Sequence, residues 1–129
     1  MGQHLIGRGI SGRLLAFIQI EEFVRSWESL GLVDDDLRAL ETQIMERPTG
    51  APVVPGTGGL RKARFAPPSW SVGKRGATRV GYSYFELEGT VFLLTVYSKG
   101  EKADLTPAER KAIRGLLERL RSAIRRKRP

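Results

Sequence analysis

The sequence contains no cysteine and only one histidine, His4, among its 129 residues. Without cysteine there are no disulfides, thiolate nucleophiles, zinc–thiolate sites or iron–sulfur clusters. A single histidine also excludes a two-histidine metal site within one chain, and a histidine-based acid–base pair in the folded core is not expected. We therefore expect no metal and no cofactor, and any chemistry has to be carried by other side chains.

Long apolar runs are also missing. The most apolar early run covers residues 14–20 and is followed at once by Glu21 and Glu22. A membrane-spanning helix needs about 20 apolar residues, and a secretion signal needs a longer apolar core and a cleavage site. We expect no membrane segment and a cytoplasmic protein, with which the lack of cysteine agrees. Residues 1–12 carry four glycines, and their apolar residues do not recur at helix or strand spacing, which predicts a flexible N-terminal extension.

Acidic residues are too few to balance the basic ones, and the two kinds are segregated. Lys and Arg number 22 against 14 Asp and Glu, a net charge of +8. Residues 20–47 carry −5, residues 60–80 carry +6 and residues 109–129 carry +7. Such charge attracts nucleic acid, an anionic membrane surface or an acidic partner, and arginine binds phosphate through two N–H groups at once. Residues 125–129 form a basic tail, either a solvated helix end or a nucleic-acid contact.

The spacing of apolar residues predicts one α+β domain over residues 13–124. Expected strands cover residues 14–19, 60–66, 78–87 and 90–99, and expected helices cover about residues 23–30, 34–47 and 107–124. The aspartates 34–36 are typical of a helix start, and Thr106 with Glu109 forms a capping box. The order β-α-α-β-β-β-α gives a small, mostly antiparallel sheet with an N-terminal helix pair and a C-terminal helix.

Alternation along the predicted strands gathers basic side chains on one face of the sheet. Residues two apart share a face, so Lys62 lies with Arg64, and Tyr97 lies with Lys99. If the three strands are neighbours, these four residues share one face with Arg79. This face is either a phosphate-binding surface or a half-exposed sheet whose outward charges oppose aggregation.

Three blocks of sequence carry a family resemblance. Residues 56–64 read GTGGLRKAR, residues 74–82 read KRGATRVGY and residues 92–106 read FLLTVYSKGEKADLT. In this order they resemble the RelE/ParE toxin superfamily, specifically its HigB-like branch, over about residues 14–120. The resemblance implies a small RelE-like, microbial-RNase-like domain, the toxin of a bacterial type II toxin–antitoxin pair. Such toxins cleave mRNA in the ribosomal A site, so the implied partners are a cognate antitoxin, the ribosome with its rRNA, and mRNA.

The resemblance also implies roles for individual residues. RNA cleavage without a metal needs the 2′-OH deprotonated, the phosphorane stabilised and the 5′-oxygen protonated. Arg64 and Arg79 are the expected phosphorane-stabilising groups, and Lys62 and Lys99 the expected proton-transfer groups. The expected RNA contacts are Arg61, Lys74, Arg75, Tyr97 and Lys102.

The sequence also departs from the family pattern. Gly100 stands where family members often carry Asn, and no Tyr or His follows Tyr97. The nearest substitutes for a proton donor are Lys102 and Asp104. Two alternatives to the nuclease follow: a catalytically inactive RNA-binding relative, or a DNA gyrase inhibitor as in the ParE branch.

Overall fold

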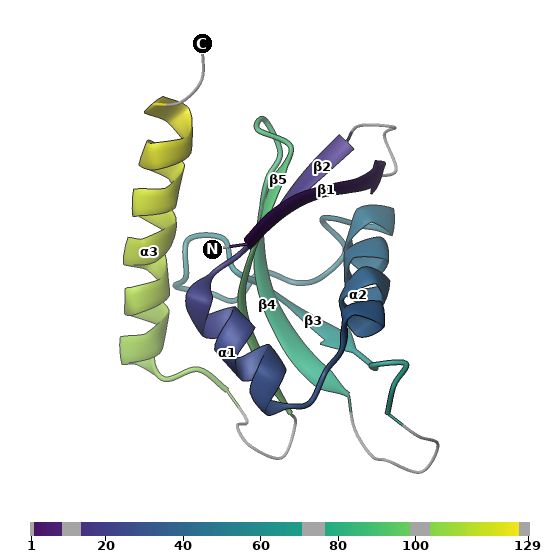
Figure 1. The fold of residues 1–129 in the computed structure, drawn as a ribbon. Coiled ribbons are helices and arrows are strands. Elements are labelled where there is room, and N and C mark those ends of the chain that lie inside the picture. Colours follow the sequence, from purple (N-terminus) through teal and green to yellow (C-terminus); the bar gives the residue numbers. More distant parts are fainter. Residues whose placement is uncertain (1, 9–13, 71–76, 99–103, 127–129) are drawn as a thin grey trace.

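The computed structural model describes residues 2–8, 14–70, 77–98 and 104–126 (Figure 1). The elements predicted from residue 14 onwards occur in the expected order, β-α-α-β-β-β-α, so the α+β fold class is confirmed. They are β2 (Leu14–Gln19), α1 (Glu21–Ser29), α2 (Asp34–Glu46), β3 (Arg61–Phe65), β4 (Thr78–Phe85), β5 (Thr90–Ser98) and α3 (Pro107–Arg126).

One strand, β1, precedes the predicted elements. Gly2–Arg8, expected to be part of a flexible extension, instead pair antiparallel with β2. The strand order is β1-β2-β5-β4-β3, in which only β2 and β5 run parallel. Without β1, the backbone N–H and C=O groups along the outer edge of β2 would have no strand partner. Pairing with β1 satisfies these groups, which accounts for the added strand. The glycine-rich composition left no alternation from which to predict it.

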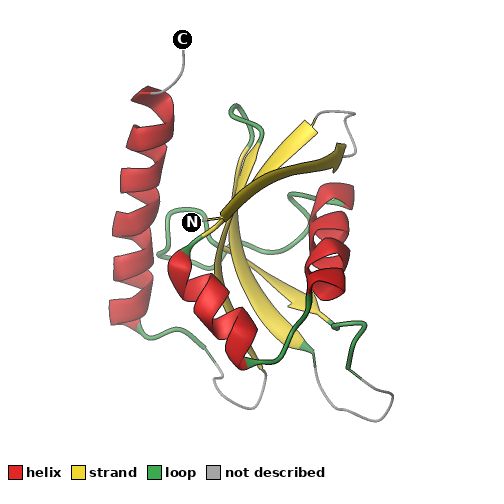
Figure 2. Ribbon diagram, viewed as in Figure 1, coloured by secondary structure: helices red, strands yellow, loops and turns green. Residues whose placement is uncertain are grey.

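Helices cover both faces of the sheet (Figure 2). On one face, α1 and α2 close a core in which the Trp27 ring stacks between Phe23 and Phe65, with centroids 5.4 and 6.3 Å away. On the other face, Leu117 of α3 is fully buried in a second cluster with Leu60, Phe85, Phe92 and Leu94. The second cluster occupies only part of its face, and the remainder of that face carries the site described below.

The starts of α2 and α3 are fixed by side-chain hydrogen bonds. The Asp36 carboxylate accepts the Val33 N–H at 3.0 Å, and the Ser69 N–H and hydroxyl at 2.9 and 2.6 Å. Burial alone would raise the pKa of Asp36, but the hydrogen bonds from Ser69 and Val33 outweigh it and hold this pKa below its usual value. At α3 the predicted capping box is confirmed, because Thr106 and Glu109 bond each other's backbone N–H at 3.1 and 2.8 Å.

The glycine-rich loop, residues 55–59, lies along α3 and leads into β3. Arg110 and Arg121 each reach a loop carbonyl oxygen at 3.4 Å, on Pro55 and Gly58 respectively. Gly58 has a φ of +75°, and a Cβ there would lie 3.4 Å from Cγ of Arg114. The positive φ therefore favours glycine at this position, whereas the approach of α3 would leave a Cβ in ordinary contact.

Candidate functional site

The strand register brings the predicted basic residues together. Arg64 pairs with Arg79, and Arg79 pairs with Tyr97, so the three form one row across β3, β4 and β5. Lys62 lies two residues from Arg64 and therefore on the same side of the sheet. We call Lys62, Arg64, Arg79 and Tyr97 the cationic face. The prediction that these four side chains share a face opposite the α1–α2 core is confirmed, because Ala63, Val80 and Val96 are buried in that core.

A glycine and a β-bulge shape the boundary between the cationic face and the cluster under α3. Gly81 lies between Lys62 and Thr95 in the next row, and a Cβ there would collide with Oγ1 of Thr95. Directly after this row the register shifts, so that Tyr82 pairs with Leu93 and Leu94 is the extra residue. The shift allows Leu94 to pack under α3, next to the point where the open part of the face begins.

Lys62 is held at the side of the site by two neighbours. Its Nζ lies 6.0 Å from the centroid of the Tyr97 ring and 4.0 Å from Oδ1 of Asp104. The same carboxylate accepts a hydrogen bond from Arg110 at 3.1 Å. Asp104 therefore bridges a cation on β3 and a cation on α3, and its own side chain is 59% exposed.

The environment of Asp104 determines its charge. The Leu105 backbone N–H, followed by the positive charges of Arg110 and Lys62, holds the pKa of Asp104 below its usual value against the effect of burial. A carboxyl group with a lowered pKa is ionised near neutral pH and accepts protons or hydrogen bonds rather than supplying a proton. The lowered pKa thus makes Asp104 a poor candidate for the substitute proton donor.

Two guanidinium groups near Lys62 have buried N–H groups that are not satisfied. Nη1 of Arg79 and Nε of Arg110 have no hydrogen-bond partner in the described structure. A buried N–H without an acceptor costs free energy, and in this side-chain arrangement neither atom is accessible to a ligand. Among the cations of the face, Arg64 is exposed and is the one best placed to bind a phosphate group.

Other predicted contacts do not join the cationic face. Arg61 lies on the opposite side of β3, where its Nη1 donates to the carbonyl oxygens of Thr49 and Ala51 at 3.0 and 2.7 Å. It therefore ties the loop before β3 to the domain and is not available to RNA in this arrangement. The predicted site residues Lys74, Arg75, Lys99 and Lys102 lie outside the described residues.

Sequence reasoning missed Arg110 as a neighbour of the site. No local pattern could have shown that α3 begins beside β3, because this proximity depends on how the two elements pack.

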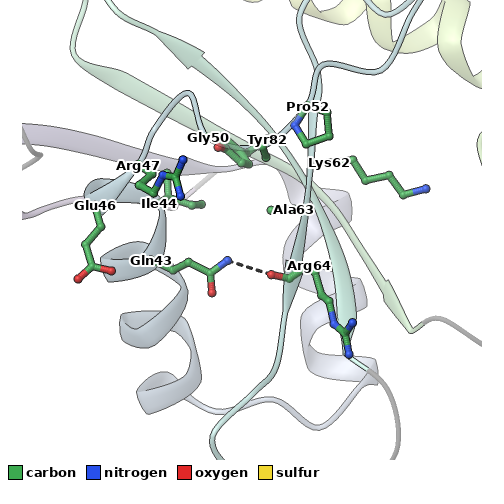
Figure 3. Close-up of a pocket in the computed structure, with 11 residues that line it drawn as sticks. Gln43, Ile44, Glu46, Arg47, Gly50, Pro52, Lys62, Ala63, Arg64 and Tyr82 are labelled. Carbon is green, nitrogen blue, oxygen red and sulfur yellow. Dashed lines mark hydrogen bonds between the residues drawn. The ribbon is translucent and has the colours of Figure 1, made fainter.

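A hollow of about 280 Å³ lies between the end of α2 and β3, on the side of the sheet opposite the cationic face (Figure 3). Lys62 and Arg64 line it from β3, and Gln43, Glu46 and Arg47 line it from the end of α2. The Gln43 side chain spans the two elements, since its Nε2 donates to the Arg64 carbonyl oxygen at 2.9 Å. Arg64 meets this hollow through its backbone, while its side chain points away from the hollow and towards the cationic face (Figure 3).

Two other kinds of feature are not found in the part of the chain that the structure describes. In residues 2–8, 14–70, 77–98 and 104–126, no three acidic or histidine side chains gather as metal ligands would. None of the helices in these ranges is long and apolar enough to cross a bilayer. No protein-family model matches the sequence, so the case for a function rests on the cationic face and its surroundings.

Proposed function

We propose that this protein is a metal-independent endoribonuclease that cleaves mRNA on the ribosome, as the toxin of a type II toxin–antitoxin pair. The observation that carries the proposal is the row of Arg64, Arg79 and Tyr97, with Lys62 beside it, on an open sheet face. Such a row combines phosphate-binding cations with an aromatic ring that can contact a base, the two kinds of group used to bind single-stranded RNA.

The two arginines fit the electrostatic demand of phosphodiester cleavage. Attack by the 2′-oxygen produces a phosphorane with additional negative charge, and fixed cations lower the barrier by stabilising it. Arg64 and Arg79 lie opposite each other on adjacent strands, where Cβ atoms are about 5 Å apart. Both guanidinium groups can therefore reach one phosphate.

Lys62 is the group in the described structure best placed for proton transfer. It is only 27% exposed and lies between the Tyr97 ring and the Asp104 carboxylate. Asp104 acts as a positioning residue that fixes the Lys62 ammonium beside the arginines, and Tyr97 orients the substrate. Lys99 remains the second proton-transfer candidate on the strength of the family resemblance.

The distribution of charge also fits the proposed partners. The acidic segment, residues 20–47, forms α1 and α2 on the face opposite the cationic residues. Phosphates of mRNA and rRNA would meet the cationic face, and an antitoxin with an acidic segment would neutralise it. These partners place the proposed activity in the cytoplasm.

Induction of the chain alone in a bacterial host, with mapping of mRNA 5′ ends, tests the proposal. Cleavages inside translated codons that disappear when initiation is blocked, and disappear in Arg79→Ala, would support it. Arg25→Ala is the matched control, because Arg25 is an exposed residue of α1 paired only with Glu21. This control should cleave like the wild type.

Two other outcomes would contradict the nuclease. Growth arrest with intact mRNA and broken DNA would indicate gyrase inhibition, as in the ParE branch. Neither arrest nor cleavage would indicate an inactive RNA-binding relative, in line with Gly100 and the missing aromatic or histidine after Tyr97.

A further inference from the structure

A groove between α1 and α3 has no part in the roles assigned so far. Its volume is about 340 Å³, and it runs along the C-terminal half of β5. Two helices form its walls and the strand forms its floor. It is lined by Glu22 and Ser26 of α1, by residues 95–97 of β5, and by Glu109 and Ile113 of α3.

The edge of β5 has no strand neighbour along this groove. β2 pairs with β5 only up to Leu93, because the chain turns into α1 directly after β2. The Ile20 N–H makes the last backbone bond of this edge, to the Leu93 carbonyl oxygen at 3.0 Å. In the part of the chain that the structure describes, β5 beyond Leu93 pairs with β4 alone. Such an edge can accept a further extended segment.

The backbone of Val96 supplies the free hydrogen-bonding groups of this edge. On the outer edge of β3, the Lys62 N–H donates to the Pro52 carbonyl oxygen. Because backbone groups alternate in direction across antiparallel pairs, those of Thr95 and Tyr97 face β4 and those of Val96 face the groove. Within the described ranges, these two groups of Val96 have no backbone partner on that side.

The groove is acidic and apolar, although the whole chain has a net charge of +8. Among the described residues that line it, Glu22 and Glu109 are acidic and none is lysine or arginine. Glu22 is exposed, and Glu109 keeps its charge while one oxygen accepts the Thr106 N–H at 2.8 Å. Leu105 and Ile113 are only partly buried by the cluster under α3. Basic and apolar groups therefore complement this groove, whereas phosphates complement the cationic face.

We infer that this groove binds an extended basic segment of a partner protein, which adds to the edge of β5 at Val96. Side chains of an added strand alternate in direction. One side chain therefore points towards α3, against Leu105 and Ile113, and the next points towards α1, against Glu22. A segment that alternates apolar and basic residues meets both walls. This inference goes beyond the proposed function, because it concerns a protein segment on a different surface from the one that would hold RNA.

A synthetic peptide of five alternating valine and arginine residues, blocked at both ends, tests the inference by NMR on ¹⁵N-labelled full-length protein. We expect it to shift the Val96 amide signal and to slow hydrogen exchange of this amide about tenfold at saturation. The same peptide with glutamate in place of arginine should do neither. Because the protein as a whole repels a basic peptide, binding of this kind reports the local charge of the groove.

Substitutions on both walls locate the binding. Glu22→Gln and Glu109→Gln should each weaken the arginine peptide about threefold, and glutamine at 109 can still accept the Thr106 N–H. Glu28→Gln is the matched control, an exposed glutamate of α1 that does not line the groove. Equal binding of the two peptides, an unmoved Val96 amide, or unchanged affinity in both groove variants would overturn the inference.

A blocking variant separates this occupant from the others. Ala112→Phe fills the groove from α3 and should weaken the peptide at least about tenfold, whereas Ala108→Phe, at an exposed position of α3 outside the groove, should not. If the peptide-free protein dimerises with concentration and only Ala112→Phe prevents this, the groove belongs to a second copy of the chain and the inference fails. It also fails if a short single-stranded RNA moves the Val96 amide and the arginine peptide does not.

Discussion

Arg64 and Arg79 are directly paired across β3 and β4, with both side chains on the open face of the sheet. Like charges at opposite positions of an antiparallel pair are destabilising. Among residues 2–8, 14–70, 77–98 and 104–126, no ion pair of an acidic residue with Arg64 or Arg79 is found, since Asp104 bonds Arg110 and lies beside Lys62 instead. An anionic ligand between the two guanidinium groups would remove the repulsion, and this accounts for their arrangement better than stability does.

Arg79→Met should separate stability from activity. Methionine keeps an aliphatic stem of similar length and removes the charge opposite Arg64, so we expect the free energy of unfolding to rise by about 0.5 kcal/mol. Cleavage of mRNA should fall by about 10²-fold or more, because one phosphorane-stabilising group is lost. Urea denaturation and 5′-end mapping measure the two effects. A clear loss of stability would show that Arg79 serves the fold rather than a ligand.

Gly81→Ala should strain the sheet at the boundary of the site. The added methyl group meets Oγ1 of Thr95, and Leu60 lies 3.2 Å away, so we expect a loss of about 1–3 kcal/mol in unfolding free energy. Thr95→Ala removes the nearest atom, so the double variant should recover part of that loss. A double-mutant cycle by urea denaturation measures the coupling between the two positions. Strictly additive effects would mean that Thr95 is not the obstacle.

Asp36→Asn should destabilise the protein by about 2–3 kcal/mol at neutral pH, because hydrogen bonds to a buried carboxylate are lost or weakened. Although burial favours a raised pKa, the hydrogen bonds leave the pKa of folded Asp36 below the unfolded value of 3.8. Its contribution is therefore complete above that value and is lost as the pH falls through the folded pKa.

The difference between wild type and Asp36→Asn should accordingly narrow as the pH falls from about 5 to about 2. Thermal unfolding across this range measures the effect. Asp34→Asn is the matched control, since Asp34 is exposed in the same first turn of α2. A constant difference at every pH would contradict the ionised state assigned to Asp36.

Asp104→Asn should strengthen binding of a short single-stranded RNA in the absence of ribosomes. The substitution removes a negative charge that bridges Lys62 and Arg110, so we expect about threefold tighter binding at about 50 mM salt, with the difference shrinking as salt is added. Fluorescence anisotropy with a labelled oligonucleotide measures this. Asp34→Asn again serves as control, and weaker binding by Asp104→Asn would show that ordering Lys62 outweighs the removed repulsion.

Local sequence signals predicted most of the fold. The apolar run predicted both ends of β2 and the capping box predicted the start of α3, because each depends on neighbours in the chain. Strand alternation also predicted the common face of Lys62, Arg64, Arg79 and Tyr97. The same alternation places Arg61 on the other face. Arg61 was predicted as an RNA contact because it is basic, although its position in the strand is inconsistent with that role.

The remainder of the site depends on packing between distant segments. The bridge from Lys62 through Asp104 to Arg110 joins β3 to the start of α3, and the hollow lined by Gln43 and Arg64 joins α2 to β3. No pattern within either segment encodes these distances. The pairing of β1 could not be predicted from the sequence either. This strand is stabilised by pairing with the edge of β2, and it has no amphipathic pattern of its own.

The parallel pair formed by β2 and β5 has a consequence for the order of folding. It joins residues 16–19 to residues 90–93, whereas β3, β4 and β5 are linked through antiparallel neighbours within residues 61–98. Closing the longer loop costs more chain entropy, so the three-stranded meander should form first and β2, with α1 and α2, should dock on it afterwards. During synthesis, β2, α1 and α2 are made first but can dock only after β5 has been made. The row of Arg64, Arg79 and Tyr97 therefore assembles before the core beneath it.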